Sequence, residues 1–146
     1  MSTYNLNRFA SAQERDYATA FEEIKQGRKR SHWMWYIFPQ IKGLGYSEMA
    51  RHYAIADLTE AEAFLHHPVL GQRLVAICNE LLKLQSNNAN QIFGNPDDIK
   101  LRSSMTLFAS VKGAPSVFHS VLQKFFDGKL DDLTLQKLGR GLYSPI

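Results

Sequence analysis

The sequence predicts an all-α protein, a compact single-domain multihelical bundle of about seven to nine helices with no significant sheet. Three observations predict this fold class. Apolar residues recur at helical intervals in several segments, helix-start residues precede these segments, and no segment shows the period-two alternation and β-branched enrichment of strands. The 146 residues suit one domain, residues 1–146, which removes roughly two thirds of its unfolded surface from water.

The first predicted helix lies near the N-terminus. Ser11 opens a capping box, and Tyr17, Phe21 and Ile24 follow at i, i+4 and i+7. Gly27 is the residue that we expect to end this helix, because glycine is the usual residue just past a helix C-terminus.

Residues 31–40 (SHWMWYIFPQ) form the most apolar stretch of the chain, directly after the basic run at residues 28–30. Each large aromatic side chain can bury roughly 150–250 Å², so this stretch cannot face water as a whole. A short buried helix fits it better than a strand, because the sequence offers no partner strands. Pro39 ends this helix, since the residue before a proline is excluded from the α region.

The middle of the chain alternates short connections with helix starts. Residues 43–46 are a flexible connection whose glycine spacing matches no phosphate-binding loop. Ser47 can cap a short helix. Thr59 and Glu62 have the spacing of a second capping box, for a helix that runs to His66.

The clearest helical pattern runs from Pro68 to Leu84. His66 and His67 precede it, and they are better explained as a surface residue and a helix cap than as metal ligands, because no partner has ligand spacing. Cys78 lies on the apolar pattern of this helix, where an inert buried thiol is expected.

The last third of the chain contains three further helix starts. Asn95 is expected to cap a helix with Pro96 in its first turn, and Pro115 begins the next helix. Asp131 or Asp132 can cap a short final helix. The residues after 139 are expected to form a loose tail.

The composition of the chain limits the classes of function that it can have. The chain is 45% hydrophobic and 21% charged, with a net charge of +3 and a pI near 9.0. It has no apolar run of ~20 residues and no signal-peptide pattern, so we expect a cytoplasmic protein without a membrane partner. A single cysteine excludes an intramolecular disulfide. No residue cluster has metal-ligand spacing, so the sequence predicts neither a metal nor a cofactor.

Four sequence blocks carry a family resemblance: SHWMWYIFPQ, GLGYS, HPVLGQRL and IFGNPDDIKLRSSMTLF, in this order. They resemble the bacterial domain-of-unknown-function 1810 family, some of whose members are labelled calpastatin-like, over about residues 8–126. The resemblance implies a small, mainly α-helical protein without an assigned activity. A calpastatin-type inhibitor is disordered until it binds, whereas this chain is aromatic-rich and amphipathic throughout, so we reject that label.

Two polar clusters beside buried segments form the candidate site. One surrounds the aromatic stretch and the other follows Pro96, and we expect the two to meet in space. Cations and hydroxyls there can hold a phosphate while a tryptophan stacks on a base or sugar. The candidate ligand-binding residues are Lys29, Arg30, Ser31, His32, Trp33, Trp35, Gln40, Asp97, Asp98, Lys100, Ser103, Ser104 and Thr106.

Several functions fit these residues, and the favoured one is binding of a phosphate-bearing small molecule, either a nucleotide or an ADP-ribose-like compound. A hydrolase acting on such a ligand would use His32 or Asp98 as general acid or base. The high pI also suits RNA or single-stranded DNA, although no known nucleic-acid motif is present. A protein-interaction module would have no small-molecule site, and the polar residues could also serve only as caps and packing. The sequence assigns neither an enzymatic activity nor an oligomeric state.

Overall fold

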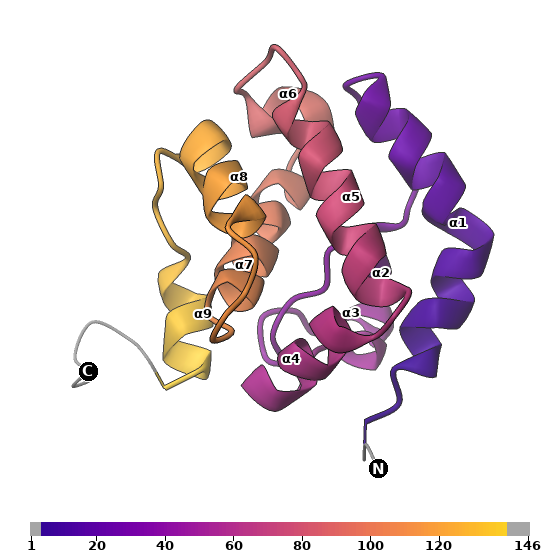
Figure 1. The fold of residues 1–146 in the computed structure, drawn as a ribbon, viewed down its shortest axis with the longest axis vertical. Helices are drawn as coiled ribbons and strands as arrows, with labels where there is room; N and C mark the ends of the chain where they lie inside the picture. Colours follow the sequence, from indigo (N-terminus) through magenta and orange to yellow (C-terminus); the bar gives the residue numbers. More distant parts are fainter. Residues whose placement is uncertain (1–3, 140–146) are drawn as a thin grey trace.

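The computed structural model describes residues 4–139, and this range contains nine α-helices (Figure 1). The all-α prediction is therefore confirmed. One isolated parallel bridge, between Ile41 and Ile55, is the sole β pairing within the described range. The helices are α1 (Asn7–Lys25), α2 (Met34–Ile37), α3 (Glu48–His52), α4 (Leu58–His66), α5 (Leu70–Leu82), α6 (Ala89–Phe93), α7 (Asp97–Ala109), α8 (Val117–Phe126) and α9 (Asp132–Lys137).

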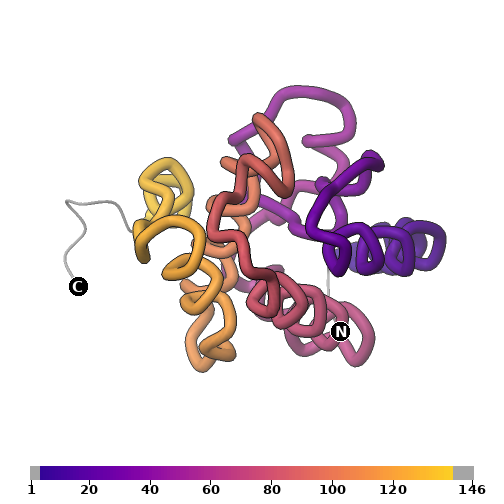
Figure 2. Tube along the Cα trace, turned by 90° about the horizontal axis from the view of Figure 1, so that it is seen from above, coloured from indigo at the N-terminus to yellow at the C-terminus, as the bar shows by residue number. Residues whose placement is uncertain are grey.

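Helix α5 occupies the middle of the molecule (Figure 1). It contacts α1 on one side and α8 on the other, and α8 in turn packs on α7. Seen from above, α1 and α9 lie on opposite sides of the molecule (Figure 2). None of the helices between residues 4 and 139 combines the length and hydrophobicity that a bilayer span requires.

Phenylalanine rings from four helices form a continuous row through the core. Phe9 of α1 meets Phe64 of α4 with ring centroids 5.2 Å apart, and Phe64 meets Phe108 of α7 at 5.3 Å. Phe108 meets Phe118 of α8 at 5.8 Å. All four side chains are fully buried, so this row joins the two ends of the chain into one core.

Two helix starts differ from the sequence predictions. Helix α1 begins at Asn7, so the predicted start at Ser11 is wrong and Ser11 lies inside the helix. Helix α4 is capped by Asp57, whose carboxylate accepts a hydrogen bond from the Glu60 amide at 2.9 Å, and not by Thr59. Aspartate and threonine two residues apart are both good caps, and the earlier one begins the helix.

Two proline-based predictions are also corrected. Helix α5 begins at Leu70 and not at Pro68, because the Nδ1 atom of His67 accepts hydrogen bonds from the amides of Val69 and Leu70 at 3.1 and 3.2 Å. His67 is therefore the capping histidine that the sequence predicts. In α7 the cap position is held by Pro96 itself and not by Asn95.

The aromatic stretch and the C-terminus follow the predictions more closely. Helix α2 is buried, as predicted, but it is shorter than the stretch, because Trp33 holds its N-terminal cap position. The carboxylate of Asp131 caps α9 by accepting a hydrogen bond from the Thr134 amide at 3.1 Å. The predicted loose tail, residues 140–146, lies outside the described residues.

Candidate functional site

A buried carboxylate from α1 fixes the start of the aromatic stretch. Glu23 accepts hydrogen bonds from the amides of Arg30 and Ser31 at 2.8 and 3.0 Å. It also accepts from the Ser31 hydroxyl at 2.5 Å and from the indole Nε1 of Trp33 at 2.9 Å. Burial alone would raise the pKa of Glu23, but these hydrogen bonds outweigh it and lower the pKa to about 2.

Trp33 is a core residue. Its side chain is 1% exposed and its ring lies against Phe38 and Phe93, with centroid distances of 6.2 and 6.4 Å. The indole N–H is already used by Glu23. Trp33 therefore offers neither its ring face nor its donor to a ligand.

An ion pair joins the two predicted polar clusters. The Nζ atom of Lys29 lies 2.9 Å from Asp97 Oδ2, and the Lys29 side chain is only 7% exposed. The same ammonium donates to the carbonyl of Ser31 and lies 4.8 Å from the Trp33 ring centroid. The second oxygen of Asp97 lies 3.6 Å from Lys100 Nζ. The clusters therefore lie side by side, with Lys29 enclosed between them and Lys100 at their outer side.

Beside this ion pair lies a more open region that we call the Trp35 surface, made of Trp35, Gln40, Lys100 and the glycine loop at residues 43–45. The Trp35 ring is half-buried, and Lys100 Nζ lies 5.4 Å from its centroid. Trp35, Gln40 and the loop glycines line a cavity of about 20 Å³. Among residues 4–139, neither the Trp35 indole N–H nor the Gln40 side-chain amide has a hydrogen-bond partner.

The loop beside Trp35 is closed at its base by backbone hydrogen bonds. The Ile55 amide donates to the Gln40 carbonyl at 2.9 Å, and the Lys42 amide donates to the Ile55 carbonyl at 2.8 Å. These two bonds form the bridge between Ile41 and Ile55. They tie Gln40 to the segment that leads into α4.

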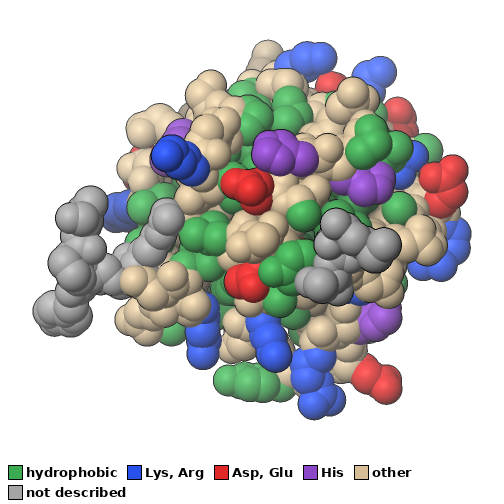
Figure 3. Space-filling view, turned by 60° about the horizontal axis from the view of Figure 1, so that its bottom comes forward, with side chains coloured by type: hydrophobic (Ala, Val, Ile, Leu, Met, Phe, Trp, Pro, Cys, Tyr) green, Lys and Arg blue, Asp and Glu red, His purple; other side chains and the backbone are tan. Residues whose placement is uncertain are grey.

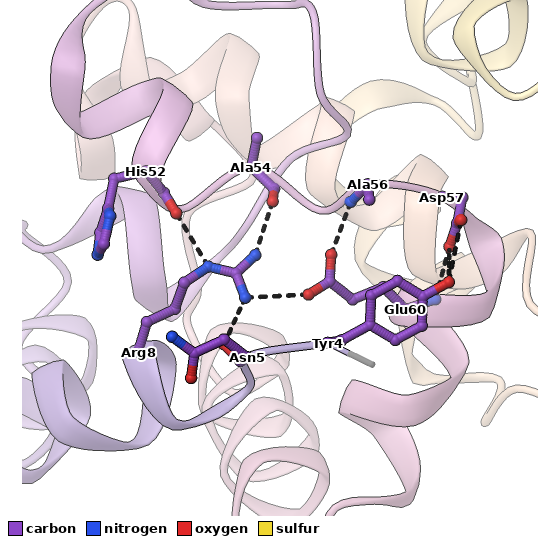
Figure 4. Close-up of polar contacts among 8 residues, drawn as sticks. All are labelled: Tyr4, Asn5, Arg8, His52, Ala54, Ala56, Asp57 and Glu60. Atoms are coloured by element: carbon purple, nitrogen blue, oxygen red, sulfur yellow. Dashed lines mark hydrogen bonds and ion pairs between the residues drawn. The ribbon is translucent and has the colours of Figure 1, made fainter. Parts of the chain in front are cut away.

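Arg8 of α1 holds the segment that leads into α4, residues 52–56, by a separate set of contacts (Figure 4). Its guanidinium donates to the carbonyls of His52 and Ala54 at 2.9 and 2.8 Å and pairs with Glu60 at 3.0 Å. Glu60 is 2% exposed, and its other oxygen accepts from the Ala56 amide at 2.7 Å. This buried network places residues 52–56, and through Ile55 it also places the loop beside Trp35.

Two lysine side chains, those of Lys42 and Lys137, lie at the glycine loop, and the exposed Glu48 follows it. Lys42 is exposed, and a side chain at Gly43 would meet Lys137 Nζ at 3.3 Å. Tyr46 is 82% exposed. On the face shown in Figure 3, Lys and Arg side chains lie along the lower edge, and Asp and Glu side chains lie near the middle of the face and at its right edge. At the loop itself, Lys42 and Lys137 favour an anionic ligand.

Other predicted site residues are engaged elsewhere. The Ser103 hydroxyl lies 3.1 Å from Asp131 Oδ2, and Thr106 Oγ1 accepts from the Asp131 amide at 2.9 Å. Both hydroxyls therefore hold the start of α9 on α7. Ser104 is fully buried, and its hydroxyl has no partner among the described residues.

His32 and Asp98 are not joined. The His32 side chain is exposed, while Asp98 accepts hydrogen bonds from Asn90 Nδ2 at 3.2 Å and from the Ile99 amide at 2.9 Å. No hydrogen bond connects the two candidate acid-base residues within the described range. Arg30 is exposed and reaches Gln26 Oε1 at 3.4 Å.

Three residues that position the site have no role in the sequence prediction: Glu23, Arg8 and Glu60. Glu23 carries the one usable signal, because it lies next to Ile24 and three residues after Ala20, on the side of α1 that faces the core. Arg8 and Glu60 are 52 residues apart, and no local pattern connects them.

Comparison with known proteins places the chain in a family. Residues 3–138 match the family described as "Protein of unknown function (DUF1810)". The chain belongs to this family. The crystal structure of the conserved hypothetical protein Rv1873 from Mycobacterium tuberculosis is similar to this DUF1810 chain, with 44% sequence identity and a TM-score of 0.91. The similarity covers 94% of this chain and 98% of that chain.

The DUF1810 match extends beyond the predicted limit of residue 126 and includes α9. The bonds from Ser103 and Thr106 to Asp131 explain this physically, because they make α9 part of the domain. The mycobacterial source of Rv1873 agrees with the bacterial family that the sequence resembles. No curated protein matches the chain significantly.

Between residues 4 and 139, no group of three or more His, Cys, Asp or Glu residues is placed to hold a metal ion.

Proposed function

We propose that this DUF1810 protein binds a phosphate-bearing small molecule, a nucleotide or an ADP-ribose-like compound, at the Trp35 surface. One observation carries the proposal. The half-buried ring of Trp35 has the Lys100 ammonium over it, 5.4 Å from the ring centroid. Trp35 and Gln40 line the same small cavity, and their polar side-chain atoms have no partner among the described residues.

Each of these three groups supplies one part of nucleotide recognition. An exposed tryptophan ring stacks on a base, which contributes roughly 1–3 kcal/mol. A lysine ammonium attracts a phosphate as a point charge. A side-chain amide both donates and accepts, so Gln40 can bond to the edge of a base or to a ribose hydroxyl.

The charge balance singles out Lys100 as the phosphate contact. Asp97 lies between two ammonium groups, so Lys29, Asp97 and Lys100 together carry one net positive charge. Lys29 is enclosed, whereas the Lys100 side chain is 27% exposed. The free positive charge therefore lies on the solvent side, over the Trp35 ring.

The shape of the surface determines how a ligand lies there. A cavity of about 20 Å³ holds roughly one water molecule and no ligand. The base therefore stacks on Trp35 from outside, and the phosphate stays close to solvent.

The experiment is a thermal-unfolding screen with ADP-ribose, AMP, adenosine and a short single-stranded RNA, at low and high salt. A ligand at a hundred times its dissociation constant stabilises the folded state by about 2.7 kcal/mol. We expect ADP-ribose or AMP to raise the melting temperature of the wild type by several degrees and adenosine to raise it less. Trp35→Ala and Lys100→Ala should lose the shift.

Lys83→Ala is the matched control for Lys100→Ala, because the Lys83 side chain is 71% exposed and its one ion pair among residues 4–139 is with Glu80. It should keep the full ligand response. No response to any phosphate-bearing compound would overturn the proposal. A response to RNA alone, falling steeply as salt rises, would replace it with nucleic-acid binding.

A further inference from the structure

A second cavity lies between α5, the end of α4 and the loop that joins α7 to α8. Its volume is about 570 Å³, within the range of roughly 300–1,000 Å³ that small-molecule sites occupy. It shares no lining residue with the Trp35 surface. Its apolar walls are formed by Leu65, Val75, Ala76, Val111, Ala114 and Pro115.

Four polar side chains line this cavity: His66, Gln72, Asn79 and Lys112. No hydrogen bond or ion pair engages any of them within residues 4–139. No carboxylate belongs to the lining, so the lysine ammonium is not neutralised at the site. Small-molecule sites usually combine apolar walls with a few polar groups. Here the polar groups lie at the solvent side of the cavity, and the lysine among them favours an anionic ligand.

The cavity is formed before any ligand arrives. A Cβ atom added to Gly71 would lie 2.0 Å from the carbonyl oxygen of Leu65, so α5 packs directly on the end of α4. The Gly71 amide donates to the His67 carbonyl at 3.2 Å. On the opposite wall, Val111 is buried in the core. Both walls are therefore anchored, and binding need not order them first.

We propose that this cavity is a second binding site, for a small organic carboxylate with an apolar body. The carboxylate pairs with Lys112 and accepts hydrogen bonds from the amide groups of Gln72 or Asn79. The apolar body lies against Val75, Ala114 and Pro115. A single ammonium with neutral amides fits a monoanion, whereas phosphate groups usually meet several cations or backbone N–H groups.

The test is a titration of the full chain, monitored by amide chemical shifts, with 2-naphthoate and its neutral isostere 2-naphthamide. The carboxylate should bind saturably and shift the amide signals of Gly71, Asn79 and Gly113, and the neutral amide should bind at least tenfold more weakly. Lys112→Glu should weaken naphthoate at least tenfold. Lys25→Glu changes the charge equally at an exposed residue outside the lining, and it should bind naphthoate as the wild type does.

Any of three results would overturn the proposal of this second site. The first is that naphthoate at millimolar concentration gives no saturable shift, and the second is that the chain binds the acid and the amide with equal affinity. The third is that Lys112→Glu and Lys25→Glu change the affinity for naphthoate equally. A further variant, Ala76→Trp, fills the cavity from an exposed position. It should block naphthoate and leave the response to ADP-ribose at the Trp35 surface unchanged. The two proposals can therefore fail separately.

Discussion

Glu23 is the residue on which the aromatic stretch depends most. A buried carboxylate is costly unless its oxygens are hydrogen-bonded, and Glu23 accepts four hydrogen bonds from residues 30–33. These bonds favour the charged form, so they lower the pKa from 4.5 in the unfolded chain to about 2. Since the folded-state pKa is the lower one, the stabilisation is fully present above pH 4.5 and is lost as the pH falls toward 2.

This gives a pH-dependent prediction for Glu23→Gln. The variant should be less stable than the wild type at pH 7, because one amide cannot accept four hydrogen bonds. The difference in unfolding free energy should shrink by about 3 kcal/mol between pH 7 and pH 2, which follows from the pKa difference. Urea unfolding of the wild type and the variant at pH 7, 4 and 2.5 measures this difference in unfolding free energy.

Glu22→Gln is the matched control, since Glu22 is exposed and, in the described part of the chain, its carboxylate accepts a hydrogen bond from Gln26 alone. Its stability difference should stay within about 0.5 kcal/mol across the same range. A Glu23→Gln difference that did not change with pH would show that the carboxylate is not the source of the stabilisation.

At the scale of elements, the Arg8 network decides where the segment between α3 and α4 lies. One guanidinium satisfies two carbonyls of this segment and the carboxylate of Glu60 (Figure 4). The planar fork of arginine makes this possible, and a lysine cannot replace it. The loop beside Trp35 is thus placed by α1, through contacts that lie more than 40 residues apart in the sequence.

We predict that Arg8→Ala lowers the unfolding free energy by about 3–5 kcal/mol, because it leaves the 2%-exposed Glu60 carboxylate without its cationic partner. Arg8→Lys should recover only part of this loss. Arg51→Ala, on exposed α3, should change stability by less than about 0.5 kcal/mol. Chemical denaturation of the three variants measures these values, and equal effects of Arg8→Ala and Arg51→Ala would contradict the account.

The helices themselves were largely predictable, because their apolar faces repeat at helical intervals over ten or more residues. The first residue of each helix was harder to predict. Several residues near each start can cap a helix, and tertiary contacts determine which of them does so, as Asp57 and His67 show. Helix α2 has only four residues, and its length depends on Glu23, which holds Trp33 outside the helix.

At the scale of the whole molecule, the sequence predicted that two polar clusters attached to buried segments would meet, but it did not show which of their residues are accessible. The clusters do meet, since Lys29 Nζ of one lies 2.9 Å from Asp97 Oδ2 of the other. The sequence could not distinguish buried Trp33 from half-exposed Trp35, because both lie in one apolar run. The sequence also could not show that Ser103 and Thr106 hold the start of α9. Their hydrogen bonds to Asp131 join residues that are 28 and 25 positions apart.

The most direct test of the central claim is fluorescence quenching of the two tryptophans by ADP-ribose. Trp33 is enclosed and Trp35 is half-exposed, so a base that stacks at the proposed surface should quench only Trp35. We predict saturable quenching in the wild type and none in Trp35→Phe, which keeps the emission of Trp33. Equal quenching in both proteins, or no saturable quenching in the wild type, would contradict it.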